Sequence, residues 1–179
     1  GNERVIRPRL ADAEFFYRTD LRTPLHQRVE ALNQIVYHNK LGSQGERVER
    51  VKRIAAWAGH ALGTDVAQCE RAALLAKADL TTLMVGEFPE LQGLMGHDYA
   101  LSGGEPIAVA QAIAMQYRIR LESPITADHA VTAALFMADR AETLIGIWGI
   151  GLAPTGERDP FGLRRAALGL INAFEQLCA

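Results

Sequence analysis

Two neighbouring residues of this chain, His97 and Asp98, carry the side chains that most often bind divalent metal ions. Imidazole and carboxylate groups can hold an ion that activates water for hydrolysis, and His60 and His129 are further imidazoles that could join them. The dipeptide lies in a glycine-containing stretch, residues 86–104, in which we expect a loop with no helix around His97. We therefore interpret His97-Asp98 as a chance pairing.

Asp79 and Asp139 are the carboxylates whose positions have a precedent. The order of the expected helices resembles that of the HD domains, which are all-α, metal-dependent phosphohydrolases. These domains use a His on one helix, a His-Asp pair on the next and an Asp on a later helix. On that comparison Ala78-Asp79 stands at the pair, Asp139 at the last ligand and Ile54 near the first. Both histidine positions are then apolar, and the two remaining carboxylates would hold a divalent ion weakly.

Buried carboxylates without a metal ion are usually paired with a cation or a hydrogen-bond donor. We expect Asp79 and Asp139 to pair with Lys77, Arg140 or a hydroxyl group, and to be vestiges of metal-ligand positions. Metal-dependent hydrolysis stays open as an alternative.

Other catalytic patterns are missing from the sequence. It has neither the G-x-S-x-G motif of a serine nucleophile nor the G-x-x-x-x-G-K-[ST] phosphate-binding loop. Cys69 and Cys178 follow no disulfide or metal-ligand spacing, which predicts reduced thiols. Trp57 and Trp148 lie in apolar contexts, so we expect core packing for both rather than base stacking.

The whole chain is not basic, so contact with nucleic acid would need local clusters of cations. Its 19 Lys and Arg residues face 21 Asp and Glu residues, which gives a net charge of −2. Three groups of basic residues are candidate phosphate ligands, and the simplest alternative for each group is a solvated face. The groups are Arg4, Arg7 and Arg9; Arg50, Lys52 and Arg53; and Arg158, Arg164 and Arg165.

The third of these groups adjoins the expected start of the last helix. Residues 146–162 are rich in glycine and proline and should form a loop, and Asp159-Pro160 should cap the helix that follows. Arg164 and Arg165 then fall in the first turns, where basic side chains oppose the helix dipole. This unfavourable placement hints at an anionic or acidic partner.

Apolar residues recur at helical spacing through most of the chain, and strand signals are nearly absent. The pattern predicts an all-α bundle of about six or seven helices. Gly63 separates two of them by so short a linker that they should form an antiparallel hairpin. We expect helices over about 24–36, 46–62, 65–84, 105–117, 127–145 and 161–177.

The first residues differ from the remainder. Residues 1–10 lack helical periodicity and contain Pro8, which favours a short extended arm. We therefore divide the chain into an arm or linker, residues 1–22, and a helical domain, residues 23–179.

The sequence shows no sign of a membrane or secreted protein. No apolar run approaches the ~18–20 residues that a membrane helix requires, and the first residues are polar and basic instead of an apolar signal core. We expect a cytoplasmic protein. Because the chain begins at Gly1, we interpret it as a segment of a longer polypeptide.

Three long segments are similar to a known family. They are GNERVIRPRLADAEFF (1–16), KADLTTLMVGEFPELQGLMG (77–96) and MADRAETLIGIWGIGLAPTGERDPFGLRRAALGL (137–170). These segments resemble the β subunit of the bacterial tetrameric glycyl-tRNA synthetases, and the resemblance covers essentially the whole chain. Because that β chain is several times longer, the resemblance implies an internal fragment, namely the end of a body domain followed by an HD-like helical domain.

The resemblance implies a role that composition does not show. In this family a separate α subunit activates glycine with ATP and Mg²⁺ in an α2β2 heterotetramer, and the β subunit contributes tRNA binding. The HD-like domain is implicated in handling the acceptor arm of tRNA(Gly), so we expect no catalytic site and no cofactor in this chain itself. The sequence departs from the family at His97-Asp98, where bulkier aromatic or basic residues are common.

The leading hypothesis is thus a noncatalytic tRNA-binding and assembly module of a glycine–tRNA ligase. A metal-dependent phosphohydrolase of the HD type and a purely structural scaffold are the alternatives.

Overall fold

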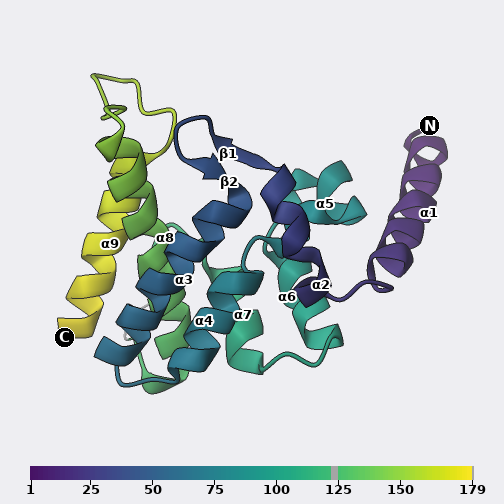
Figure 1. Ribbon diagram of the computed structural model, residues 1–179. Helices are drawn as coiled ribbons and strands as arrows, with labels where there is room; N and C mark the ends of the chain where they lie inside the picture. The colour runs from purple at the N-terminus through teal and green to yellow at the C-terminus, as the bar shows by residue number, and fades with distance from the viewer. Residues whose placement is uncertain (122–124, 179) are drawn as a thin grey trace.

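The computed structural model describes residues 1–121 and 125–178, and the all-α prediction is confirmed (Figure 1). Seven long helices appear among the described residues: α1 (Asn2–Asp20), α3 (Gln44–Ala61), α4 (Val66–Leu75), α6 (Leu94–Ser102), α7 (Ile107–Met115), α8 (Ala130–Gly149) and α9 (Leu163–Cys178). The shorter helices are α2 (Leu25–Arg28) and α5 (Leu83–Glu87), with 3-10 turns at Glu30–Gln34, Ala78–Thr81, Pro89–Leu91 and Ala127–His129.

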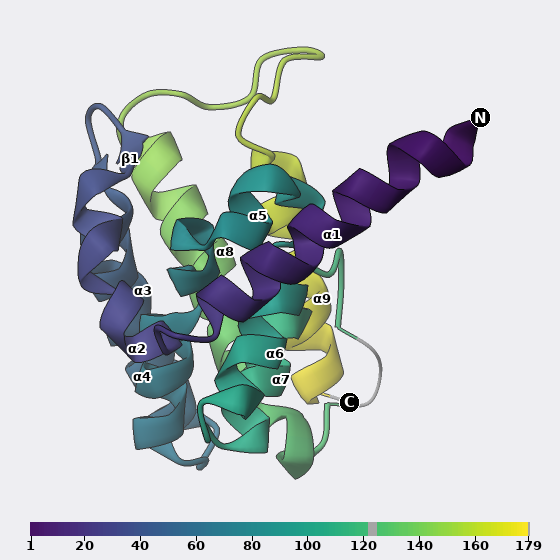
Figure 2. The same ribbon diagram turned by 90° about the vertical axis from the view of Figure 1, so that its right-hand side faces the viewer.

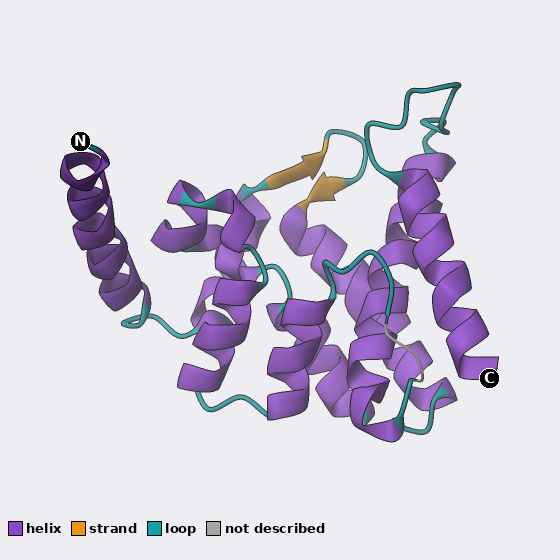
Figure 3. Ribbon diagram, turned by 180° about the vertical axis from the view of Figure 1, so that it is seen from behind, coloured by secondary structure: helices purple, strands orange, loops and turns teal. Residues whose placement is uncertain are grey.

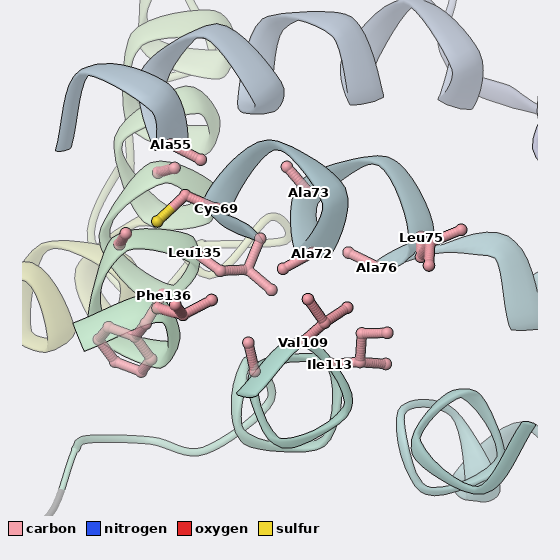
Figure 4. Packing of buried hydrophobic residues seen from close by; sticks show 14 of the residues in the cluster. Ala55, Cys69, Ala72, Ala73, Leu75, Ala76, Val109, Ile113, Leu135 and Phe136 are labelled. Atoms are coloured by element: carbon pink, nitrogen blue, oxygen red, sulfur yellow. The ribbon is translucent and has the colours of Figure 1, made fainter. Parts of the chain in front are cut away.

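Helix α8 is the central element of the bundle, and it packs against α3, α4, α7 and α9. The core around it consists largely of alanines, which allow helix backbones to approach closely, with larger side chains filling the remaining space. Figure 4 shows this packing: Ala55 of α3, Ala72 of α4 and Val109 of α7 meet Leu135 and Phe136 of α8. Each of these side chains is 0% exposed, so together they define the rigid part of the molecule.

The predicted hairpin over residues 46–84 is confirmed for α3 and α4, although its second helix is shorter than expected. Ser43 and Asp65 cap the two helices by accepting backbone N–H groups in their first turns, and Gly63 turns the chain between them with a φ of 68°. Helix α4 ends at Leu75 because the following residues form a 3-10 turn, after which Thr82 caps the separate helix α5.

The expectation of a helix over residues 24–36 is only partly right. Helix α2 and a 3-10 turn cover most of it, but the chain then enters a small antiparallel hairpin, β1 (Val36–His38) and β2 (Gly42–Ser43) (Figure 3). Val36 opposes Ser43 in that hairpin and is exposed. Val36 therefore continues the apolar spacing of the residues before it without lying on a buried helical face.

The prediction of an extended N-terminal arm is wrong, because residues 2–20 form the continuous helix α1. Pro8 lies inside this helix, and the loss of its N–H group is tolerated where the helix is solvated and no neighbouring element packs on it. Two ion pairs at i,i+4 spacing, Glu3–Arg7 and Glu14–Arg18, support the exposed face. Figures 1 and 2 show that α1 projects away from the bundle.

Asp20 joins α1 to the bundle. Its carboxylate accepts the backbone N–H groups of Leu83 and Met84 at 2.9 and 3.0 Å, and the Tyr99 hydroxyl at 2.7 Å. Arg28 lies 3.6 Å from the same carboxylate. Asp20 is 2% exposed, so it acts as a buried cap for the first turn of α5.

The expectation of buried tryptophans is also wrong. Trp57 is 71% exposed on α3 and Trp148 is 59% exposed near the end of α8. The apolar residues beside them in sequence lie on other faces of their helices, with small residues such as Ala55 and Ala58 taking the core positions. No helix in the described part of the chain is both long enough and apolar enough to cross a membrane.

Candidate functional site

Asp139, near the middle of α8, is held first by an arginine from α3. Arg47 donates from Nη2 to Asp139 Oδ1 and to Thr143 Oγ1, both at 3.0 Å. Its Nε lies 2.8 Å from Glu142 Oε2, an ion pair without hydrogen-bond alignment. Arg50 reaches the other oxygen of Glu142 at 3.1 Å. Because Arg47 and Glu142 are buried, water screens these interactions between α3 and α8 only weakly.

Two further cations complete what we call the Asp139 cluster: Asp139, Arg47, Lys77 and Arg140. Lys77 Nζ lies 3.7 Å from Asp139 Oδ1 and donates to the Tyr117 hydroxyl at 3.1 Å. Arg140 Nη1 lies 3.4 Å from Asp139 Oδ2, and the guanidinium also donates to two backbone carbonyls just after α7. The predicted pairing of Asp139 with Lys77 and Arg140 is therefore confirmed.

Burial and charge oppose each other in the Asp139 cluster. Burial raises the pKa of Asp139, but Lys77, Arg47 and Arg140 together outweigh it and hold the pKa below its usual range. Burial lowers the pKa of Lys77 to about 8; Arg47 and Arg140 act in the same direction, and Asp139 opposes them. Asp139 is thus a stable anion, whereas the proton of Lys77 is held less tightly than that of an exposed lysine.

Asp79 does not pair with a cation or a hydroxyl as expected, because backbone N–H groups take that role. Its Oδ2 accepts from Gly93 at 2.7 Å and from Gly96 at 3.0 Å. These two residues must be small: a Cβ on Gly93 would lie 2.5 Å from the Tyr117 ring, and one on Gly96 would lie 2.7 Å from Ile113. Burial raises the pKa of Asp79, while the two backbone hydrogen bonds lower it. Asp79 therefore caps the start of α6.

The His97-Asp98 dipeptide lies within α6, so the expectation of a loop is wrong. The glycines around it do not break the chain, because Gly93 adopts a φ of 83° to start a helix on the buried Asp79. Asp98 accepts the hydroxyl of Tyr17 from α1 at 2.7 Å. Asp98 thus helps to hold the end of α1 against the bundle.

The surroundings of Asp139 do not fit a divalent ion. Ile54 lines an apolar groove between α3 and α9, and the α3 residue that reaches Asp139 is Arg47. Lys77 and Arg140 approach the same carboxylate, and three cations repel a fourth. Among the described residues, no three His, Cys, Asp or Glu side chains are grouped so that they could hold a metal ion.

A pocket of about 280 Å³, which we call the Arg165 pocket, opens beside the Asp139 cluster. Asp139 and Arg140 of α8 form one wall, and Tyr117 forms another. Phe161, just before α9, and Arg165, in its first turn, close the pocket. The pocket therefore connects the buried cluster with the surface.

We call the three candidate arginines around the start of α9 the basic corner; they are Arg158, just before the helix, and Arg164 and Arg165, in its first turn. All three are exposed, and none forms an ion pair within residues 1–121 and 125–178. Arg164 donates to the Gly156 carbonyl at 2.5 Å. The predicted cap is confirmed, because Asp159 accepts the first backbone N–H groups of α9, at 2.8 and 2.9 Å.

The other candidate arginines lie elsewhere. Arg50 is engaged with Glu142, whereas Arg53 is exposed on the outer face of α3. The remaining three are spread along α1, at the opposite end of the molecule from α9 (Figure 1). They are Arg4, Arg7 and Arg9. Among the candidate groups, only the basic corner keeps all its arginines exposed and without an ion pair among the described residues.

Arg47 is the residue that reasoning from the sequence missed. It lies one turn before Val51 on the apolar face of α3 and is only 5% exposed. An arginine on the buried stripe of an amphipathic helix needs a carboxylate partner from another element. That position could have singled it out among the charged residues at the start of α3.

Fold and site together define a class: an all-α bundle in which salt bridges around Asp139 join α3 to α8. A family model described as "Glycyl-tRNA synthetase beta subunit" matches residues 1–177. The chain belongs to this family.

Curated relatives agree with that assignment. The glycine–tRNA ligase β subunit of Neisseria gonorrhoeae is 55% identical over 176 residues, which are 98% of this chain and 26% of the relative. That of Ralstonia nicotianae is 56% identical over 172 residues, 96% of this chain and 25% of the relative. The chain thus spans about a quarter of the length of these relatives.

Proposed function

We propose that this chain is a tRNA-binding and assembly module of a glycine–tRNA ligase, without a catalytic site of its own. Membership of the β-subunit family supports the assignment to the ligase. The observation that carries the RNA-binding role is the basic corner, where three arginines are exposed and form no ion pair among the described residues. Arginines in this state bind phosphate groups well, because their planar donors match phosphate oxygens.

The chain would act as one part of a larger assembly. Its place would be in the cytoplasm beside an α subunit, in an α2β2 enzyme in which the α subunit uses ATP and Mg²⁺ to activate glycine. Its RNA ligand would be the acceptor arm of tRNA(Gly). We also propose that residues 1–22 belong to a connection from a preceding domain, which agrees with the projection of α1 from the bundle (Figure 2). Residues 23–179 would form the HD-like domain.

The composition of the Asp139 cluster supports a noncatalytic role. A hydrolytic site would need an ion or a general base with access to a water molecule. Here Arg47, Lys77 and Arg140 engage the carboxylate of Asp139, and a hydrogen-bonded network of this kind stabilises the packing of α3 on α8 rather than activating water.

Binding of an acceptor-stem minihelix by the intact α/β enzyme tests the RNA-binding role. We expect the double variant Arg164→Ala/Arg165→Ala to bind the minihelix at least about tenfold more weakly, because two charge-assisted phosphate contacts are lost. Arg22→Ala is the matched control, since Arg22 is exposed on the segment between α1 and α2. Equal affinity of the double variant and the wild type would refute the role of this corner.

A further inference from the structure

The charged side chains that line the Arg165 pocket are mostly cationic. Arg140 and Arg165 line it together with the single carboxylate of Asp139. Behind this lining, Lys77 and Arg47 engage the same carboxylate, and Arg47 also pairs with Glu142. Like charges this close repel one another unless an anion joins them.

The cations divide into those that supply charge and one that supplies hydrogen-bond donors. Arg140 is committed to Asp139 and to backbone carbonyls, so it contributes mainly its charge. Arg165 lines the pocket, is exposed, and forms no hydrogen bond or ion pair with the described residues. Burial lowers the pKa of Arg140 and Asp139 raises it, while the nearby Arg165 and Arg47 add to the lowering.

Tyr117 offers a neutral donor at the same pocket. Its hydroxyl accepts from Lys77, so its own proton remains for donation to a ligand. Burial, together with Asp79 and Asp139, raises the pKa of Tyr117, which keeps the hydroxyl protonated. The first N–H groups of α9 are already taken by Asp159. An anion would therefore be bound by side chains and not by the helix terminus.

Phe161 gives the pocket an aromatic wall against which a planar ligand could stack. Its ring lines the pocket, is 39% exposed, and makes an edge contact with the His38 ring, whose centroid lies 5.7 Å away. A partly exposed aromatic ring beside cations is the combination that binds a base and its phosphate in proteins that recognise single-stranded nucleic acid.

We propose that the Arg165 pocket binds one nucleotide, with its phosphate at Arg165 and Tyr117 and its base against Phe161. This inference deepens the proposed function and rests on it for the natural source of the ligand, which would be an unpaired nucleotide at the end of the acceptor arm. A free nucleoside monophosphate has the same chemistry, so the two sources need separate arms of one experiment.

Calorimetric titration of the full-length α/β enzyme with 5′-CMP tests the pocket directly. Cytidine is the phosphate-free probe and inorganic phosphate the base-free probe; a pyrimidine also avoids a catalytic site that takes ATP. We expect 5′-CMP to bind more tightly than either. Arg165→Gln should weaken 5′-CMP binding by about tenfold or more, and Phe161→Leu should weaken 5′-CMP by about fivefold without affecting phosphate.

Arg164→Gln separates this inference from the proposed function. Arg164 lies outside the pocket and is bonded to Gly156, so its loss should weaken a minihelix but leave 5′-CMP binding unchanged. If RNA is the natural ligand of the pocket, Arg165→Gln should weaken binding of the complete minihelix more than binding of a minihelix without the unpaired 3′ end. If only a free nucleotide binds there, Arg165→Gln should affect the binding of both minihelices equally.

Three results would overturn the pocket: no binding of 5′-CMP, equal binding of 5′-CMP and cytidine, or equal effects of Arg164→Gln and Arg165→Gln on 5′-CMP. In each case minihelix binding by the wild-type enzyme could persist, and the proposed function would then stand without the pocket. Failure of the wild-type enzyme to bind the minihelix would instead refute the proposed function.

Discussion

Arg47 and Asp139 show how one ion pair can decide whether a buried carboxylate is structural or reactive. The guanidinium donates to Asp139 and Thr143 of α8 and forms an ion pair with Glu142 of the same helix. Lys77 approaches the same oxygen of Asp139 as Arg47, and Arg140 approaches the other oxygen, so cations occupy both oxygens of the carboxylate. At the scale of single residues, the balance of buried charges therefore determines what this site can do.

Removal of Arg47 tests that balance. We expect Arg47→Met to lower the free energy of unfolding by about 3 kcal/mol, because two buried carboxylates lose their shared partner. Arg53→Met, on the exposed face of the same helix, is the matched control and should change it by no more than about 0.5 kcal/mol. Urea denaturation measures both. If the two variants were equally stable, the Arg47 pairs would contribute nothing.

Lys77 predicts a dependence of stability on pH. Its pKa is about 8 in the folded chain against an ordinary value of 10.5, so between these values the unfolded state binds more protons. Stability from this group must therefore rise as the pH increases from about 8 toward 10. Lys77→Met is the comparison, because the other titrating groups contribute nearly equally to the wild type and the variant. The free energy of unfolding of the wild type minus that of Lys77→Met should therefore increase over this pH interval. A difference that falls or stays flat would contradict the burial of Lys77.

At the scale of elements, the stretch from Asp79 to Gly96 organises one end of the bundle. Asp79 binds the first N–H groups of α6, and Asp20 binds those of α5. Both helix starts are therefore capped by carboxylates from other elements, so their positions depend on tertiary contacts. The close approach of α6 to α7 at Gly96 depends on the missing side chain.

Two glycine substitutions in this stretch should have opposite effects. Alanine at Gly96 would place its Cβ 2.7 Å from Ile113 and 3.0 Å from Asp79, so we expect a loss of about 1–3 kcal/mol despite better helix propensity. At Gly86, inside α5, an added methyl group would meet no atom within 4 Å, and Gly86→Ala should raise stability by about 0.5–1 kcal/mol. Thermal unfolding distinguishes the two; stabilisation by both would contradict the close packing of α6 on α7.

Helices whose start and apolar face are marked by neighbouring residues were predicted from the sequence. Helices whose start depends on residues distant in the sequence were not. Apolar spacing located α3, α8 and α9, and Asp159 was identified as a cap from its place before Pro160. By contrast, α6 starts on a carboxylate that lies 14 residues earlier, and no local pattern reveals such a cap. The first half of α1 was missed because Pro8 was given more weight than the helix formers around it.

Some features of the candidate site were likewise predictable from the sequence, and others were not. The pairing of Asp139 with Lys77 and Arg140 follows from the rule that buried charges need partners, and it was predictable. The position of Arg47 on the apolar face of α3 could have been noticed, but its partners could not, because they depend on which face of α3 meets α8. Proximity of Phe161, Tyr117 and Arg165 in one pocket requires the packing of α7, α8 and α9.

At the scale of the whole molecule, the chain is a bundle with α1 projecting from one end and the basic corner at the other (Figure 1). This arrangement suits a module that is attached at one end and meets a ligand at the other. The nearly neutral overall charge, −2, means that RNA binding would be confined to the basic corner and its pocket.

The hydrolase alternative gives a contrary prediction for the intact enzyme. Because cations surround Asp139, we expect no stoichiometric binding of a divalent metal at Asp79 and Asp139. We also expect no nucleotide hydrolysis that depends on Asp139, so Asp139→Ala should leave phosphate release unchanged. Elemental analysis and a phosphate-release assay would decide this. Metal bound in stoichiometric amounts, together with turnover that Asp139→Ala abolishes, would favour the hydrolase.

The salt dependence of minihelix binding tests the central claim most directly, since it counts the phosphates that the protein neutralises. The slope of log K against log salt should be less steep by about 2–3 in Arg158→Ala/Arg164→Ala/Arg165→Ala than in the wild-type α/β enzyme, about one unit for each lost phosphate contact. An unchanged slope with unchanged affinity would show that the basic corner does not contact RNA.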